Sequence, residues 1–170
     1  MLVLDLVRLS REGSLSVGGR IPPDSPLWED TGVRFSESLR VDLRATEAQS
    51  GEIVVRGNMV GSLAKECRLC LDEVRVTLRE DVTLVFVPPD LLDGTGDGDV
   101  RVLPASEHEV DLAEFLRAEV ILAAPAYIVC GPNCRGLCAR CGADLNETTC
   151  ECVVEEPDPR WEVLRALNTE

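Results

Sequence analysis

The sequence lacks the segments that place a protein in or across a membrane. No apolar run approaches the roughly 18 residues of a membrane-spanning helix. The first residues, MLVLDLVR, carry Asp5 inside their apolar run and no small-residue cleavage site, so we expect no secretory signal. We therefore expect a cytoplasmic protein with no membrane partner. In that reducing compartment, eight cysteines indicate metal or redox chemistry rather than disulfides.

Positive charge is scarce. The chain has 17 Lys and Arg against 31 Asp and Glu, a formal net charge of -14. Phosphate contacts require Lys and Arg, so this balance argues against direct binding of RNA and favours a basic partner, or an acidity that only keeps the protein soluble. The acids are densest over residues 88–114, which we take as the first candidate surface for a basic partner: Asp90, Asp93, Asp97, Asp99, Glu107, Glu109, Asp111 and Glu114.

Catalytic motifs are also lacking. The single histidine, His108, lies between Glu107 and Glu109, with no candidate nucleophile near it in the sequence. No Ser-His-Asp set, phosphate-binding glycine loop or zincin motif is present. We therefore predict that the protein is not an enzyme and has no small-molecule substrate.

Alternation of apolar and polar residues predicts antiparallel strands in the first half of the chain. It occurs over Leu2–Leu6, over Val33–Leu43, and in two longer arms, Ile53–Leu63 and Val74–Phe86, which we pair as a hairpin. Glu80 falls on the apolar side of its arm, so we expect a bulge or a strand edge there. A short strand is expected near Val100–Leu103.

Two helices are predicted. Asp111 and Glu114 suit the start of a helix over about 111–123, and Pro125 ends it. A terminal helix begins at Asp158, with Trp161, Leu164 and Leu167 on one side. The expected fold class is α+β, with a mainly antiparallel, barrel-like sheet, one or two packed helices and a cysteine-rich zinc-binding C-terminal segment. Residues 1–125 form the β-rich domain, with an acidic loop over 88–110, and residues 126–170 form a cysteine-rich segment followed by the terminal helix.

Six of the eight cysteines lie in CGPNCRGLCARCGADLNETTCEC, residues 130–152. A Cys-x-x-Cys turn brings two thiolates to one point, and zinc takes four in tetrahedral geometry. The simplest closed structural Zn²⁺ site is Cys138, Cys141, Cys150 and Cys152. The other four thiols, Cys67, Cys70, Cys130 and Cys134, form a second site, unless Cys67 and Cys70 are only small half-buried hydrophobic residues.

Two chemical alternatives use the same cysteines. Cys134, Cys138 and Cys141 have the spacing of the iron–sulfur motif of radical S-adenosylmethionine enzymes, but the barrel that follows such a motif needs roughly 200 residues. Thiol–disulfide exchange requires a thiol of low pKa at a helix start, and Cys67 lies between two predicted strands. A cysteine-dependent redox or iron–sulfur protein is therefore the less favoured alternative.

Four segments together resemble the bacterial YceD family: Cys67–Leu71, Val110–Pro125, Cys134–Asn146 and the terminal DPRWEVLRAL. The resemblance implies a non-catalytic cytoplasmic protein that supports accumulation of 23S ribosomal RNA and biogenesis of the large ribosomal subunit. Its expected partner is a basic ribosomal protein or a pre-50S particle, with contact to ribosomal RNA indirect. A zinc-containing adaptor for protein or RNA outside ribosome assembly is the main alternative function.

Overall fold

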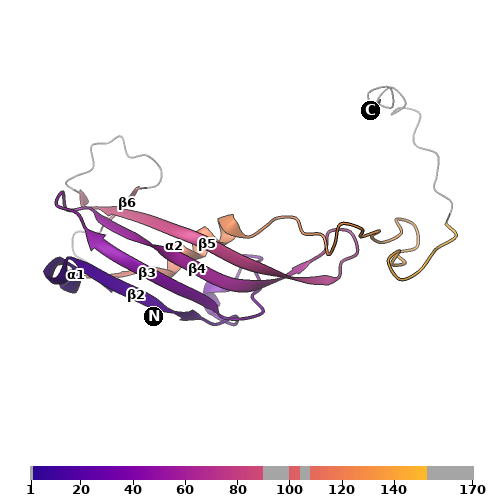
Figure 1. Ribbon diagram of the computed structural model, residues 1–170, viewed down its shortest axis with the longest axis horizontal. Coiled ribbons are helices and arrows are strands. Elements are labelled where there is room, and N and C mark those ends of the chain that lie inside the picture. Colours follow the sequence, from indigo (N-terminus) through magenta and orange to yellow (C-terminus); the bar gives the residue numbers. More distant parts are fainter. Residues whose placement is uncertain (1, 90–99, 104–107, 153–170) are drawn as a thin grey trace, which may run out of the picture.

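The computed structural model describes residues 2–89, 100–103 and 108–152. Its centre is a sheet of five strands in the order β2-β3-β4-β5-β6 (Figure 1). All neighbours are antiparallel except β5 and β6, which run parallel. The strand bounds are β2 (Ser14–Ile21), β3 (Leu39–Glu47), β4 (Ile53–Glu66), β5 (Glu73–Val87) and β6 (Val100–Val102).

The predicted hairpin is confirmed as β4 and β5. Their register is continuous from Ile53 opposite Phe86 to Glu66 opposite Glu73. Glu80 stands opposite Met59 within this register, so the bulge or strand edge expected there is wrong. The hairpin is much longer than its neighbours, and its far end extends toward the cysteine-rich segment (Figure 1).

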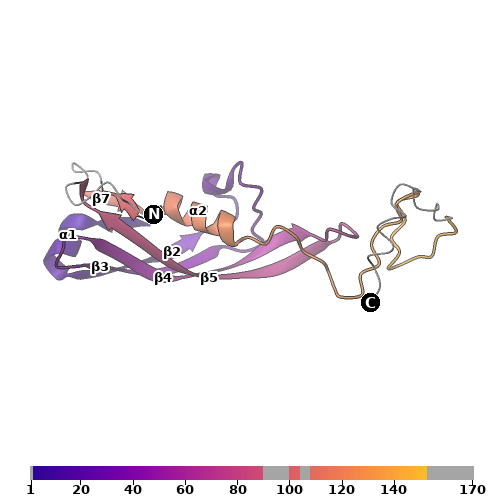
Figure 2. The ribbon, with the colours of Figure 1, turned by 90° about the horizontal axis from the view of Figure 1, so that it is seen from above.

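A second layer covers one face of the sheet (Figure 2). It contains the small sheet of β1 (Val3–Asp5) and β7 (Glu109–Asp111) and the helix α2 (Ala113–Ala123). The predicted helix over about 111–123 is thus confirmed, and the Asp111 carboxylate accepts a hydrogen bond from the Ala113 amide at 3.0 Å. Leu116 and Val120 of α2 are completely buried, and Phe115 meets Phe86 edge to face at 5.1 Å.

The loop between β2 and β3 closes one end of this core. It contains the short 3-10 helix η1 (Pro26–Trp28), and Trp28 packs on Phe35 with ring centroids 4.6 Å apart. The guanidinium of Arg117 donates to the Leu27 carbonyl at 2.9 Å and to the Glu29 carbonyl at 3.2 Å, which fastens α2 to this loop.

Two N-terminal expectations differ from the structure. Leu6 begins the helix α1 (Leu6–Glu12) instead of ending a strand, because Asp5 caps it by accepting from the Arg8 amide at 2.8 Å. The strand expected over Val33–Leu43 begins only at Leu39, and Phe35 makes an isolated bridge to Leu63.

The expected barrel-like closure is also wrong. In the described part of the chain β2 and β6 lie at opposite edges of the sheet and do not pair with each other, so the sheet is open. The second layer covers one of its faces (Figure 2). The α+β class itself fits. The division at residue 125 stays a prediction, and the terminal helix from Asp158 and most of the acidic loop lie outside the described residues. Among the helices described, none has the length and apolar character to cross a bilayer.

Candidate metal centres

The loop between β4 and β5 is a tight turn built around Cys67. The Cys67 amide donates to the Asp72 carbonyl at 2.8 Å, and the Leu71 amide donates back to the Cys67 carbonyl at 2.9 Å. This closure places Leu71 at a φ of 66°, in the left-handed region. The Cys67 sulfur accepts from the Leu69 amide at 3.4 Å. The turn therefore aims backbone N–H groups at a sulfur, which stabilises its thiolate form.

The same turn recurs around Cys138. The Cys138 amide donates to the Ala143 carbonyl at 2.8 Å, and the Gly142 amide donates to the Cys138 carbonyl at 2.9 Å, the same offsets as in the first turn. Gly142 has a φ of 71°, matching Leu71 in position and conformation. Both Cys-x-x-Cys motifs thus fold into one local structure, which we call the knuckle.

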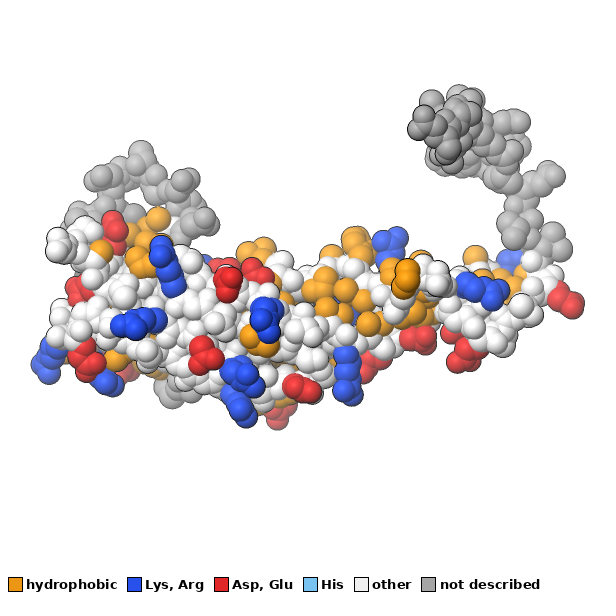
Figure 3. Space-filling model, in the orientation of Figure 1, with side chains coloured by type: hydrophobic (Ala, Val, Ile, Leu, Met, Phe, Trp, Pro, Cys, Tyr) orange, Lys and Arg blue, Asp and Glu red, His pale blue; other side chains and the backbone are white. Residues whose placement is uncertain are grey.

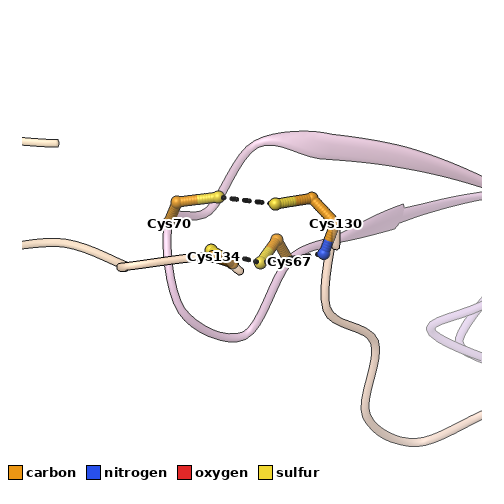
Figure 4. A group of neighbouring side chains, drawn as sticks. All are labelled: Cys67, Cys70, Cys130 and Cys134. Atoms are coloured by element: carbon orange, nitrogen blue, oxygen red, sulfur yellow. Dashed lines mark hydrogen bonds between the residues drawn. The ribbon is translucent and has the colours of Figure 1, made fainter. Parts of the chain in front are cut away.

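The first knuckle contributes two cysteines to a four-thiol group, the hairpin-tip group (Figure 4). The other two, Cys130 and Cys134, come from the segment after α2. The sulfurs lie 3.8 Å apart for Cys67 and Cys134, and 3.6 Å apart for Cys70 and Cys130. Tetrahedral bonds of about 2.3 Å to one metal would place sulfurs about 3.8 Å apart, whereas a disulfide requires about 2.05 Å. The spacing fits a metal site.

The second knuckle contributes to the terminal group, which contains Cys138, Cys141, Cys150 and Cys152. The ligand atoms in each group lie within 4.8 Å of one another. The two groups differ in burial, since Cys67 and Cys70 are buried whereas every thiol of the terminal group is at least partly accessible. Either group could hold a metal ion, and each is the set of four that the sequence predicted.

The close packing of four thiols in each group shifts their pKa values in a way that favours binding of a cation. The N–H of Cys70 lowers the pKa of Cys67 to about 6, and the N–H groups of Cys141 and Arg140 lower the pKa of Cys138 to about 6. In the same groups neighbouring thiols work in the opposite direction, so that Cys141 and Cys138 raise the pKa of Cys152 to about 12. One thiolate therefore forms readily in each group, whereas a thiol whose pKa is raised, such as Cys152, needs a bound cation to lose its proton.

The iron–sulfur reading of the Cys134, Cys138 and Cys141 spacing does not fit the fold. Cys134 belongs to the hairpin-tip group, while Cys138 and Cys141 belong to the terminal group. The three cysteines of that motif must bind one cluster, so their division between two groups contradicts the reading. The alternative in which Cys67 and Cys70 are only hydrophobic residues is also weakened, because both face other thiols (Figure 4).

Two polar residues near the hairpin-tip group escaped the sequence analysis. The Asp72 carboxylate accepts from the Cys70 thiol at 3.1 Å, and the Asn146 amide lies 3.7 Å from the Cys134 sulfur. Asn146 also accepts from the Arg135 amide at 2.7 Å, which shapes the chain just after Cys134. The position of Asp72 directly after Cys70 was an available signal. Asn146 closes the Cys134–Asn146 segment that carries the family resemblance, but nothing in the sequence indicated its contact with the Cys134 thiol.

Backbone hydrogen bonds join the cysteine-rich segment to the hairpin tip. The Arg68 amide donates to the Ile128 carbonyl at 2.8 Å, and the Leu137 amide donates to the Leu69 carbonyl at 2.9 Å. Gly136 permits this approach, since a Cβ there would lie 2.9 Å from the Leu69 carbonyl oxygen. These two bonds and the hairpin-tip group form what we call the clasp.

Fold and site together define a small α+β protein in which the tip of an open sheet and a C-terminal segment bring eight cysteines into two groups of four, each able to hold a metal ion. The chain belongs to the YceD family. The family model, described as "Large ribosomal RNA subunit accumulation protein YceD", matches residues 55–168, which include all but the first two residues of the hairpin and all eight cysteines.

The chain is similar to several curated proteins. An uncharacterized protein of Mycobacterium tuberculosis is 31% identical over 126 residues, covering 74% of this chain and 60% of its own. A Zea mays protein named "Large ribosomal RNA subunit accumulation protein YCED homolog 1, chloroplastic" is 34% identical over 97 residues, 49% of this chain and 33% of its own. The Arabidopsis thaliana protein of the same name is 36% identical over 64 residues, 38% of this chain and 20% of its own. This chain thus spans about 60% of the length of its mycobacterial relatives. No solved structure matches it.

Proposed function

We propose that the protein is a non-catalytic cytoplasmic factor that supports accumulation of large-subunit ribosomal RNA by binding a precursor of the large ribosomal subunit. The observation that carries this proposal is the family match over residues 55–168, which spans both the hairpin and the cysteine-rich segment. The names of the two plant relatives refer to the same role.

Both metal groups support a role in scaffolding rather than in chemistry. The ion we assign to them is Zn²⁺, because four thiolates in tetrahedral spacing are its usual structural ligands. Four protein sulfurs leave no coordination position for water or substrate, so neither site would activate a reactant. Their contribution is to order residues 126–152, where the described chain has few buried hydrophobic side chains of its own.

The surface around the hairpin tip supports binding of a protein component. Tyr127 is 75% exposed and Leu71 is 59% exposed, and Leu69 and Val129 are exposed beside them. Arg68 lies over the Tyr127 ring, 5.2 Å from its centroid. Figure 3 shows hydrophobic side chains gathered toward this end of the molecule. Exposed aromatic and aliphatic residues near an Arg are typical of protein interfaces, and a basic ribosomal protein remains the partner expected from the acidic composition.

Sedimentation tests the proposal directly. The tagged full-length chain, expressed in its own cells, should migrate with large-subunit precursors rather than with mature ribosomes, and depletion should lower the ratio of large- to small-subunit ribosomal RNA. The variant Gly131→Ala, whose new methyl group would touch nothing within 4 Å, is the control and should migrate as the wild-type chain does. A protein that stays at the top of the gradient across a range of salt, with an unchanged RNA ratio on depletion, would refute the role in assembly.

A further inference from the structure

The face of the sheet that points away from α2 carries arginines in two rows across the strands. One row contains Arg20 opposite Arg40, then Val60, and then Arg79, on four adjacent strands. The other row contains Arg44 opposite Arg56. All five side chains are exposed, and we call this surface the arginine face. Figure 3 shows Lys and Arg side chains spread over this part of the molecule, with Asp and Glu side chains interspersed among them.

The arginines on this face are placed where they repel one another. Residues directly opposite on antiparallel strands have Cβ atoms roughly 5 Å apart, and like charges there are destabilising. Two such pairs occur, Arg20 with Arg40 and Arg44 with Arg56. Asp42 and Asp81 lie in the row between them, yet neither forms an ion pair with these arginines. Within the described residues, the three ion pairs join Arg8, Arg34 and Arg101 to glutamates elsewhere.

One of the repelling pairs borders a hollow. A shallow depression of about 320 Å³ is lined by Arg44, Thr46, Val54 and Arg56. The Arg44 guanidinium donates to the Ser14 hydroxyl at 3.0 Å, which uses one of its five N–H donors and leaves the others for a ligand. Two guanidinium groups on either side of a hollow suit an anion that accepts bidentate hydrogen bonds, such as a phosphate diester.

We propose that the arginine face holds the phosphate backbone of RNA. This inference deepens the proposed function and rests on it, because it assigns a direct RNA contact to the protein on the large-subunit precursor. It also replaces the expectation that a net charge of -14 prevents RNA contact: charges separated by more than a Debye length, about 8 Å at physiological salt, are largely screened, so the local charge decides.

The chemistry of the face favours RNA over other anionic partners. A membrane-binding surface combines cations with exposed large apolar side chains, and among the described residues none of the exposed large hydrophobic side chains lies on β2 to β5. The aromatic ring on these strands, Phe86, is buried against α2, so the face has no platform on which bases could stack. Contact is therefore with phosphates, and we expect affinity without sequence preference.

Binding of a fluorescent double-stranded RNA of about 16 base pairs, the span of one double-stranded-RNA module, tests the inference with the full chain carrying its metal. Arg44→Gln/Arg56→Gln is compared with Arg11→Gln/Arg135→Gln, which removes the same charge from exposed positions off the sheet. The first double variant should lose about tenfold or more in affinity at ~50 mM salt and reduce the slope of log affinity against log salt by about two. The second should leave both nearly unchanged.

Four outcomes count against the inference: no binding of the RNA by the wild-type chain at low salt, equal losses in both double variants, no loss in either, or competition by poly-glutamate as strong as competition by RNA at equal charge. The last would indicate an acidic protein as the partner. Sedimentation of the Arg44→Gln/Arg56→Gln variant separates the two proposals. If this variant binds RNA as tightly as the wild-type chain and still migrates with precursors, the arginine face is wrong and the assembly function stands.

Discussion

Substitution of the first knuckle tests whether the hairpin-tip group is a metal site that fastens the cysteine-rich segment. In Cys67→Ser/Cys70→Ser two of the four thiolates are lost, and two hydroxyl groups cannot replace them as zinc ligands. We expect native mass spectrometry to report two zinc ions in the wild-type chain and one in the variant. The reciprocal variant, Cys138→Ser/Cys141→Ser, should also retain one ion, which makes it the matched control.

The two variants should differ in whether residues 126–137 stay attached to the hairpin tip. The remaining clasp contacts, from Arg68 to Ile128 and from Leu137 to Leu69, are two hydrogen bonds worth about 1 kcal/mol each. Ordering the chain between Ile128 and Leu137 costs about 1–2 kcal/mol per residue, so two such bonds cannot hold it. The zinc site, worth on the order of 10 kcal/mol or more, can.

Limited proteolysis and thermal unfolding followed by circular dichroism check this reasoning. Cleavage should appear within residues 126–137 in the first variant and spare that region in the second. The unfolding midpoint of the sheet should change little in either, since the hydrophobic core contains none of the cysteines. Two zinc ions in Cys67→Ser/Cys70→Ser, or full protection of residues 126–137 without the metal, would refute the role of the group as a fastener.

Three further predictions concern the backbone and pH. Gly57→Ala should destabilise the sheet by about 3 kcal/mol, because a Cβ there would lie 2.0 Å from a carbonyl oxygen of β3 and would force the strands apart, whereas Gly131→Ala should be neutral in the same denaturant titration. Leu71→Gly should relieve about 1 kcal/mol of strain at its positive φ and bind zinc a few-fold more tightly in chelator competition, while Gly142→Leu should do the reverse. Zinc affinity should fall steeply as the pH drops toward 6, because protons compete with the metal for the thiolates. At pH 6 the solution reaches even the lowered pKa of Cys138, about 6 instead of 9.0. An affinity that is equal at pH 6 and pH 8 would contradict thiolate ligation.

Local signals in the sequence predicted the parts of the fold that are themselves local. Strict alternation identified the β4–β5 hairpin, and helical spacing after Asp111 identified α2, although its N-cap is Leu112 and not Asp111. The strand β2 was missed although Leu15, Val17 and Ile21 share one phase, because the adjacent Gly18 and Gly19 interrupt the run and glycine is unfavourable in strands. Whether the sheet closes depends on edge strands that lie far apart in sequence, and no local pattern determines that.

The cysteine groups and the arginine face also differ in how far local sequence signals predicted them. The grouping of cysteines was predictable, because each Cys-x-x-Cys turn carries two ligands in fixed relation and only the pairing between turns had to be inferred. The arginine face was not, because it arises from register: Arg20, Arg40 and Arg56 come from three strands and become neighbours only when those strands pair. The net charge of the whole chain therefore argued against RNA as a partner, whereas the local arrangement of arginines favours it.

The β4–β5 hairpin gives the two sites a common support. Arg56 and Arg79 lie along its length, and Cys67 and Cys70 lie at its tip, so the arginine face and the clasp are joined by one continuous ladder of backbone hydrogen bonds. The core fixes the face without any metal, whereas the tip depends on metal to hold residues 126–152 in place. Loss of zinc should therefore leave contact with RNA phosphates intact and remove the contacts made by the apolar surface around Tyr127. On this division, we propose that the sheet supplies affinity for the ribosomal precursor without sequence preference, and that the cysteine-rich segment, once it holds metal, determines which protein component is recognised.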